Sequence, residues 1–455
     1  MKKNRIILQA FVLGLFISFS FDPMAIAGDT ASSQPTLTEE EAVSSAIKNN
    51  YDLRQAMISV EFAKIELVKA GLWPNPEGEF SIRSDKYYAN EGEGGYEYGL
   101  NQAIPISGRT FFQKKVAKLG IERAEWQLKD VERQVIAQVK KTFYQVTTLE
   151  EKEKVLQFLV KTNQDLLKSV KARLSQAEVS SVDISLAQGE LLMANQELAE
   201  VKAHLYETRA TLNQLTGQSL SYPFIIVPKP LIFPSIDLDT ATQNSLENRP
   251  DLKVKELEEK MGGSALTLAK AMQIPDITVG GFFQKDKSRI DVNGEPITSN
   301  SRFFGIKVSM PLPFFNRNQG EIARTAVENK SVGLQYEALK TQVAKEVAQA
   351  YIRLEASKEI LSSYGNGVKE DVEKSLKVMQ NAYLQGQVNV FDVVQTQSKF
   401  YSIENAYLDA SQNAREAIID LESVLGENSH SEKMSSDENS SGQHSTSKLK
   451  EGNKL

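Results

Sequence analysis

The chain contains two copies of one unit. The segment at residues 46–53 returns in altered form at residues 245–252, where Asp52-Leu53 becomes Asp251-Leu252. Later positions return as well: Asp183, Gln188 and Gly217 become Asp392, Gln397 and Gly426. A unit of roughly 200 residues is far longer than a solenoid repeat. We therefore expect two similar halves that stack or pair, so that a feature of one half predicts its counterpart in the other.

The N-terminus has the three parts of a secretory signal peptide. Basic residues precede an apolar run at residues 6–21, and Ala25-Ile26-Ala27 forms a cleavage site of the small-x-small type. Such a segment is removed on export and takes no part in the fold. We predict a signal peptide at residues 1–27 and a mature chain that begins at Gly28; the alternative is an uncleaved N-terminal membrane anchor.

The composition argues against several classes of function. The formal net charge is −6, and loss of the basic signal peptide makes the chain more acidic, which disfavours nucleic acid as a partner. There is no cysteine, so we expect no disulfide and no lipid on an N-terminal Cys. With three histidines, and no recognisable nucleophile–base pair or phosphate loop, we expect no metal site, no cofactor and no enzymatic activity. No stretch after residue 27 is apolar for long enough to predict a transmembrane helix.

The order of predicted elements is the same in both halves. The first structural repeat, at residues 28–217, has a helix at 37–71, two strands within 77–106 and helices at 110–174 and 182–216. A proline-rich connector at residues 218–237 follows. The second repeat, at residues 238–426, has a helix at 239–270, strands at 276–286 and 301–311, and helices at 319–384 and 390–425. Residues 427–455 are polar, and we predict that this tail is disordered.

Apolar residues step by three and four along the long helical segments. In the last segment they are Val393, Thr396, Phe400, Ile403, Tyr407, Ala410, Ala414, Ala417, Leu421 and Val424. Sustained 3.5-residue spacing predicts coiled-coil packing. A helix of about 65 residues would be on the order of 100 Å long at 1.5 Å per residue, too long for a compact domain. Small residues in these seams would let the rods approach closely and form a wall.

The strands alternate apolar and polar residues. In segment 303–310, Phe304, Ile306 and Val308 share one face, while Lys307 and Ser309 share the other. Such strands fit a membrane barrel with its apolar face outward; the alternative is a soluble hairpin that covers a core. Four strands cannot close a barrel, because about eight is the small limit. We therefore expect a homotrimer with twelve shared strands, and twelve helices that form a tube continuous with the barrel.

Aromatic residues and prolines mark the joints between strands and helices. The aromatic residues are Trp73, Phe111, Phe112, Phe314 and Phe315. Aromatic side chains at such positions are typical of a membrane–water interface, although ordinary packing at a joint is the alternative for each. Asn318 followed by Glu321 also predicts a capping box at the start of the second long helix.

These features resemble the TolC family of outer-membrane efflux ducts, and most closely its CzcC-like and CusC-like branch, which serves heavy-metal exporters. The resemblance covers residues 37–426 and is carried by Leu72-Trp-Pro-Asn-Pro76, Ala103-Ile-Pro-Ile-Ser-Gly108, Arg249-Pro-Asp-Leu252, Pro311-Leu-Pro-Phe-Phe-Asn-Arg-Asn-Gln-Gly-Glu321 and Tyr383-Leu-Gln-Gly386. It implies a mainly helical chain with a small β part. Three chains would form a β-barrel in the outer membrane of a Gram-negative cell and an α-barrel in the periplasm, docked on an inner-membrane pump through a periplasmic adaptor.

The resemblance also implies a gate at the periplasmic tip. The turns at Ala177 and Gly386 would contact the adaptor. A hydrogen bond from Tyr383 to Asp183 of a neighbouring coil would hold the coils shut, and Asp392 would form an acidic ring in the pore. The alternative for both aspartates is helix capping.

The sequence departs from the family pattern at three tip positions. Gln395 occupies a ring position that is often acidic in the best-known member, Val388 replaces the basic residue of its tip network, and Ala177 replaces the glycine of the first turn.

The predicted function is passive conduction, most simply of heavy-metal cations, from pump and adaptor to the outside. Two alternatives stay open. One is a TolC-like duct for drug efflux or type I protein secretion; the other is a soluble periplasmic coiled-coil scaffold.

Overall fold

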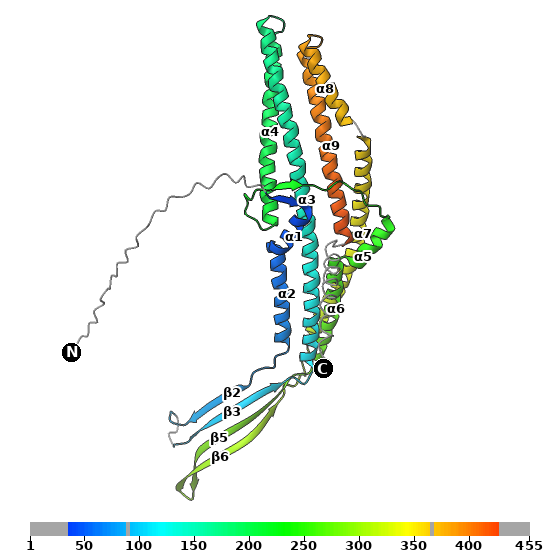
Figure 1. Cartoon of the computed structure of the whole chain (residues 1–455). Helices are drawn as coiled ribbons and strands as arrows, with labels where there is room; N and C mark the ends of the chain where they lie inside the picture. Colours follow the sequence, from blue (N-terminus) through cyan, green and yellow to red (C-terminus); the bar gives the residue numbers. More distant parts are fainter. Residues whose placement is uncertain (1–34, 88–91, 365–367, 427–455) are drawn as a thin grey trace, which may run out of the picture.

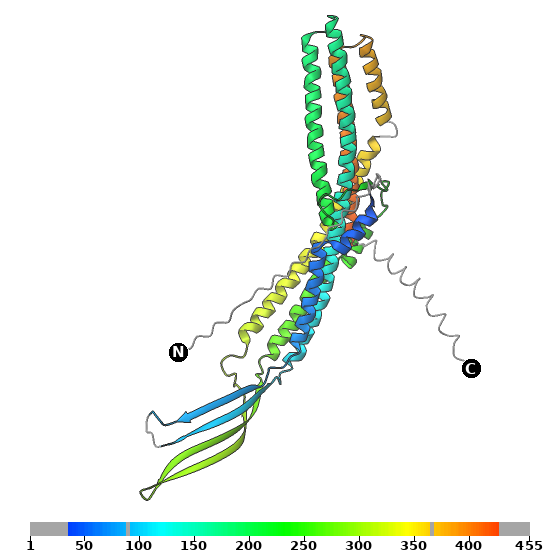
Figure 2. The same ribbon diagram turned by 60° about the vertical axis from the view of Figure 1, so that its left-hand side comes forward.

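The protein is a long helical rod with a small sheet at one end, as the computed structural model shows in Figures 1 and 2. The structure describes residues 35–87, 92–364 and 368–426. The predicted signal peptide at 1–27, the start at Gly28 and the tail at 427–455 therefore lie outside the described residues. The sheet and the tips of two helical hairpins lie at opposite ends of the rod.

The long helices of the first repeat confirm the predicted rods. Helix α3 (Arg109–Ser175) has 67 residues and α4 (Ser181–Leu215) has 35. Their apolar seam is buried as the heptad spacing predicts, with Val139, Leu156 and Leu212 fully enclosed. At 1.5 Å per residue α3 is about 100 Å long, so it reaches from the sheet to the tip.

The second repeat has the same hairpin with one difference. Helix α7 (Gln319–Ser363) and α8 (Val368–Leu384) replace the single helix that was predicted at 319–384, while α9 (Val390–Leu425) matches its prediction. The prediction of one continuous helix is therefore wrong. Gly365 and Gly367 lie between the two helices, and glycine is among the weakest helix formers.

The two shorter predicted helices are also interrupted. Segment 37–71 is split into α1 (Glu39–Asn49) and α2 (Tyr51–Ala70), and segment 239–270 into α5 (Leu238–Asn248) and α6 (Pro250–Ala271). Asn50 is extended, and its side chain caps α2 by accepting from the amides of Asp52 and Leu53. Arg249 is extended at the equivalent place, because the proline that follows it disfavours helical geometry.

A small parallel sheet lies at mid-height. Strand β1 (Thr36–Thr38) pairs with β4 (Ile225–Val227), which lies inside the proline-rich connector. The pairing brings the start of the first repeat against the connector that leads to the second. Helices α1 and α3 join these strands in one core, which includes Phe143 and Phe224.

The four-stranded sheet joins the hairpins of both repeats. Its strands are β2 (Glu77–Ser84), β3 (Gly94–Ile104), β5 (Ile277–Val292) and β6 (Glu295–Ser309), in the order β2-β3-β5-β6, and all neighbours are antiparallel. The second hairpin is longer than predicted, because its strands continue to a tight turn at Asn293-Gly294, where both residues have positive φ.

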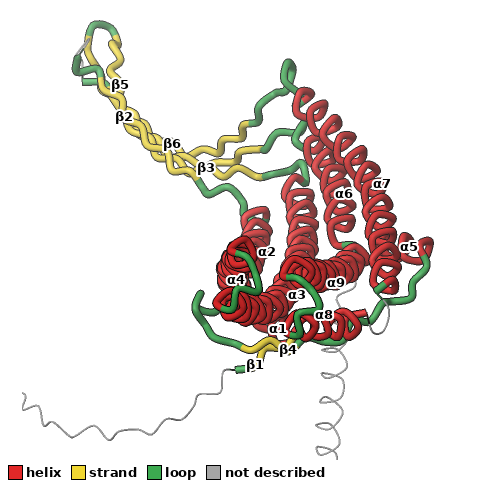
Figure 3. Tube along the Cα trace, turned by 90° about the horizontal axis from the view of Figure 1, so that it is seen from above, coloured by secondary structure: helices red, strands yellow, loops and turns green. Residues whose placement is uncertain are grey.

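The sheet extends away from the helices, and in the described chain no helix covers either face (Figure 3). This arrangement contradicts the alternative of a soluble hairpin that covers a core.

The expected capping box of the second long helix does not form. Asn318 has φ 59 and makes no side-chain cap; its amide instead donates to the Ala269 carbonyl over 2.8 Å. Gly108 precedes α3 in the same left-handed conformation, with φ 70. Both repeats thus enter their long helix through a left-handed residue, where glycine fits best and asparagine next best.

Candidate functional site

The tips of the two hairpins are built alike. The first turn contains Ala177 with φ 58 and the second contains Gly386 with φ 74, each just after a helix end. After the turns, Asp183 accepts from the amide of Ser180 over 2.8 Å, and Asp392 accepts from the amide of Asn389. Both aspartates therefore complete capping boxes, as the capping alternative predicted, and each has a second carboxylate oxygen that this contact does not use.

Tyr383 lies in the core between the two coils, not on the tip surface. Its side chain is 2% exposed, and it packs with Val170, Ala187 and Val393. The buried hydroxyl makes no close hydrogen bond among the described residues, although the Arg173 guanidinium lies near enough to interact with it, so the expected bond to Asp183 is not made within one chain. Burial raises the pKa of Tyr383, and the nearby Asp183 carboxylate adds to the rise while Arg173 opposes it.

Arg173 connects the two hairpins and was not predicted from the sequence. It lies in the last turn of α3, and its Nη1 donates to the Tyr383 carbonyl of α8 over 2.9 Å. Its Nε donates to Glu178 of the first turn over 3.0 Å, and the guanidinium lies 5.1 Å from the Tyr383 ring centroid. A basic side chain is therefore present at the tip although Val388 carries none, and it comes from the first hairpin.

An open pocket of about 560 Å³ lies between the two turns. Its walls include Arg173, Glu178, Asp183 and Asp392. Gln395 is exposed one turn further along α9. The geometry places three of the predicted gate residues together in one chain, and it leaves Gln395 on the adjacent helix surface.

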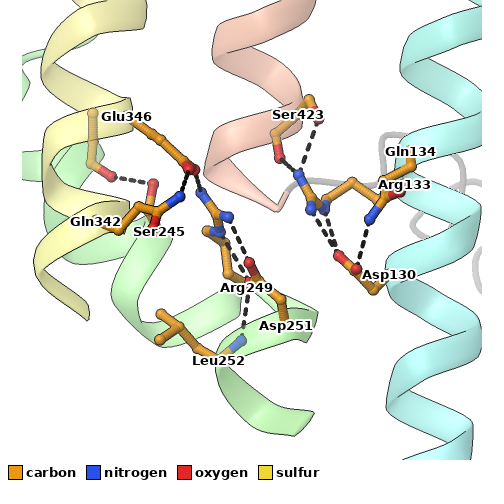
Figure 4. Close-up of polar contacts among 11 residues, drawn as sticks. Asp130, Arg133, Gln134, Ser245, Arg249, Asp251, Leu252, Gln342, Glu346 and Ser423 are labelled. Carbon is orange, nitrogen blue, oxygen red and sulfur yellow. Dashed lines mark hydrogen bonds and ion pairs between the residues drawn. The ribbon is translucent and has the colours of Figure 1, made fainter. Parts of the chain in front are cut away.

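A charged network at mid-height ties the repeats together (Figure 4). Arg249 is 4% exposed, and its guanidinium binds both carboxylate oxygens of Asp251, at 3.0 and 2.6 Å, and one oxygen of Glu346 of α7 at 2.6 Å. Nearby, Arg133 of α3 binds Asp130 and also donates to the carbonyl of Ser423 in α9. The Arg249-Pro-Asp-Leu252 motif thus secures the start of α6.

The predicted interface aromatics lie at the joints between strands and helices. Trp73, Phe111, Phe314 and Phe315 are exposed, and Phe112 is half-buried with its ring against that of Phe111. Within one chain these four side chains are therefore not packed into the joint, and their place at a membrane–water interface stays a prediction. Arg109 fixes the same joint through an ion pair of 2.6 Å to Asp276.

Within the described part of the chain, no group of three or more His, Cys, Asp or Glu side chains is arranged to hold a metal ion. None of its helices is both long and apolar enough to cross a membrane.

The chain is similar to known proteins over most of its length. Two segments, residues 42–218 and 241–427, match the family described as outer membrane efflux protein. The cobalt-zinc-cadmium resistance protein CzcC of Cupriavidus metallidurans is 24% identical over 91% of this chain and 98% of its own. The pyoverdine export outer membrane protein OpmQ of Pseudomonas aeruginosa is 21% identical over 84% and 83%.

Solved structures share the fold. A crystal structure of CusC has a TM-score of 0.70 at 18% identity and covers 85% of this chain and 92% of its own. The structure of the outer-membrane channel OprN also has a TM-score of 0.70, at 16% identity. That match covers 85% of this chain and 89% of the OprN chain. These structures have the fold predicted from the resemblance, and the two matched segments correspond to the two repeats. The chain belongs to the outer membrane efflux protein family.

Proposed function

We propose that the protein is the homotrimeric outer-membrane channel of a tripartite efflux system that exports heavy-metal cations. The main observation in favour of a trimer is that the sheet of one chain has two open edges. Strands β2 and β6 are both edges of the sheet, and unpaired edges need partners inside a membrane. A second and third copy would supply them, because β6 of one copy can pair with β2 of the next.

The helices at the two sides of the chain support the same assembly. Helix α2 exposes apolar side chains at heptad spacing, including Ile58, Phe62 and Ile65, which are 51%, 64% and 58% exposed. Helix α7 exposes Val327 and Leu334. These faces are continuous with the open strand edges, so packing of α7 against α2 of the next copy would bury both.

The relatives support metal export over other substrates. The match to CzcC spans nearly all of that protein, whose name states cobalt, zinc and cadmium resistance. Relatives named for pyoverdine export and for toxin and drug export match at lower identity, which keeps a duct for drug efflux or protein secretion as the second candidate. The acidic Asp392, repeated three times around a narrow neck, would favour cations.

The proposed assembly has four parts: a signal peptide, two joined repeats, a membrane zone and an adaptor-facing tip. The signal peptide at 1–27 directs export, and the repeats at 28–217 and 238–426 are joined by the connector at 218–237. Outer-membrane lipid surrounds the sheet at the level of the joint aromatics. The turns at Ala177 and Gly386 face the periplasmic adaptor, which links the channel to the inner-membrane pump.

The assembly is tested by two measurements. The detergent-corrected mass of the purified protein should be that of three mature chains, and the protein should stay with membranes after osmotic shock. A monomer with full strand content would contradict the trimer, and release by osmotic shock would favour the periplasmic scaffold.

The substrate is tested in cells that lack their own metal-efflux channel but retain the pump and adaptor. Expression of the chain should restore growth in cobalt, zinc or cadmium. Rescue of drug export without rescue of metal tolerance would favour the second candidate.

A further inference from the structure

The outward face of the sheet has two zones with different chemistry. Register places Phe80, Tyr98, Phe283 and Phe304 side by side in one row across all four strands. Further apolar side chains continue the same face toward the helices: Leu100, Val279, Ile306 and Val308. This apolar zone matches the lipid-facing band of a membrane barrel with an aromatic row near its border.

A basic zone begins one row beyond the aromatic row, at the end far from the helices. Lys285 of β5 lies directly opposite Arg302 of β6, and Lys287 follows two residues along β5 on the same face. The Lys285 ammonium lies 5.8 Å from the Tyr96 ring centroid. From Ile277 to Lys285 the strand spans about 26 Å, or roughly 20 Å once tilted, so the cations lie at the outer border of the apolar band.

This arrangement is unfavourable without an anion. Like charges directly opposite each other on one face of a sheet destabilise the strand pair. In the described chain, Lys285, Lys287 and Arg302 have no ion-pair partner, and their register neighbours on this face include Tyr96, Gly94 and Asn300, none of them acidic. On the opposite face, by contrast, Arg83 has its carboxylate, Asp286, at 2.8 Å.

A second copy of the chain would not neutralise the basic zone from its adjoining strand. Strand β6 is an edge, and the strand expected beside it is β2 of the next copy. The residues of β2 on the outward face are Gly78, Phe80, Ile82 and Ser84, which contain no carboxylate. Among the described residues, no carboxylate of this face or of the adjoining β2 strand compensates the basic zone, so we look for its anion in the surroundings of the barrel.

We propose that Lys285, Lys287 and Arg302 form a binding site for the phosphate groups of lipid headgroups in the outer leaflet. The proposal rests on the outer-membrane location proposed above. Arginine binds phosphate through two parallel N–H donors and lysine acts as a point charge, so one headgroup phosphate can bridge the opposed pair. The three subunits would present three such sites around the barrel, immediately beyond the aromatic row.

The probe is lipid A, whose sugar carries phosphate, compared with lipid A from which the phosphates have been removed. Binding to the detergent-purified trimer is followed by native mass spectrometry and by the shift in unfolding temperature. Wild-type protein should bind the phosphorylated form more tightly. Lys285→Gln with Arg302→Gln should weaken that binding by roughly thirtyfold, at about fivefold per charge near a membrane surface. Lys307→Gln, which removes a cation from the opposite face of β6, is the matched control and should bind as wild type does.

Three outcomes would overturn the proposal: equal binding of both lipid forms, wild-type binding by the double variant, or the same thermal shift with inorganic phosphate alone. If the double variant does not assemble, two single variants address the same question. Lys285→Arg keeps the charge and should retain binding of lipid A, whereas Lys287→Gln removes a charge and should weaken it. Conductance in planar bilayers separates this result from the proposed function. A wild-type trimer that conducts but ignores lipid phosphate refutes only the lipid site, whereas a protein that forms no pore refutes the channel.

Discussion

The guanidinium of Arg173 donates to the main-chain carbonyl of Tyr383 over 2.9 Å and so joins the last turn of α3 to the last turn of α8. The two residues are 210 positions apart and belong to different repeats. A bond to a main-chain atom fixes the relative position of the two hairpins, whatever side chain Tyr383 carries. Because the same guanidinium also holds Glu178, one side chain restrains both coils at the tip.

Replacement of Arg173 by Gln should loosen the tip. A charge-assisted hydrogen bond contributes about 1.5–3 kcal/mol, so its loss in three subunits shifts the gate toward open states. We expect higher single-channel conductance in planar bilayers. Lys171→Ala, which removes an exposed cation two residues away, is the control and should leave conductance unchanged. Equal conductance for wild type and Arg173→Gln would show that Arg173 is not part of the gate.

Tyr383→Phe should have little effect on conductance. Within the described part of the chain the buried hydroxyl makes no close hydrogen bond, and the short contact with Arg173 is to the Tyr383 carbonyl. Removal of an unpaired buried hydroxyl is neutral or slightly stabilising, so the unfolding temperature should stay the same or rise. A clear increase in conductance would instead identify an acceptor for this hydroxyl on a neighbouring subunit, with Asp183 the first candidate.

Asp392→Asn should reduce block by divalent cations added from the periplasmic side. Asparagine keeps an oxygen that can accept from the Asn389 amide, so the N-terminus of α9 should remain capped. The substitution removes one negative charge per subunit, or three from the ring of the trimer. Gln395→Glu adds three charges on the adjacent surface of α9 and should strengthen the block. If both variants are blocked like wild type, these positions do not line the ion path.

The sequence predicted the elements that depend on long periodic patterns. The bounds of α3, α4 and α9 lie within one residue of those expected from heptad spacing, and the alternating strands were located from period two. The breaks at Asn50 and Arg249 were missed because the apolar pattern continues across them. The local signals were present, since Asn50 is a good N-cap and Arg249 precedes Pro250.

The features that escaped prediction are contacts between distant segments. Strand β4 has three residues, too few for a pattern, and it forms only because β1 lies beside it. Arg173 reads as one basic residue among many until the second hairpin brings the Tyr383 carbonyl to it. Capping by Asp183 and Asp392 could be read from sequence, whereas the absence of a partner for the Tyr383 hydroxyl depends on packing that only the fold determines.

Asp251→Asn should lower stability at neutral pH and change its dependence on acid. Burial works to raise the pKa of Asp251, but the hydrogen bonds and charge of Arg249 outweigh it and hold that pKa below its ordinary value of 3.8. A carboxyl with a depressed folded-state pKa contributes stability that is fully present above 3.8 and is lost as pH falls through the lower folded-state value. The variant leaves Arg249 buried with Glu346 as its remaining charged partner, so we expect a loss of about 2 kcal/mol at pH 7, less than for a fully buried pair. Thermal unfolding between pH 7 and pH 2 measures both effects: the difference between wild type and variant should shrink below pH 4. A constant difference across that range would show that the Asp251 charge contributes nothing and that the loss comes from packing alone.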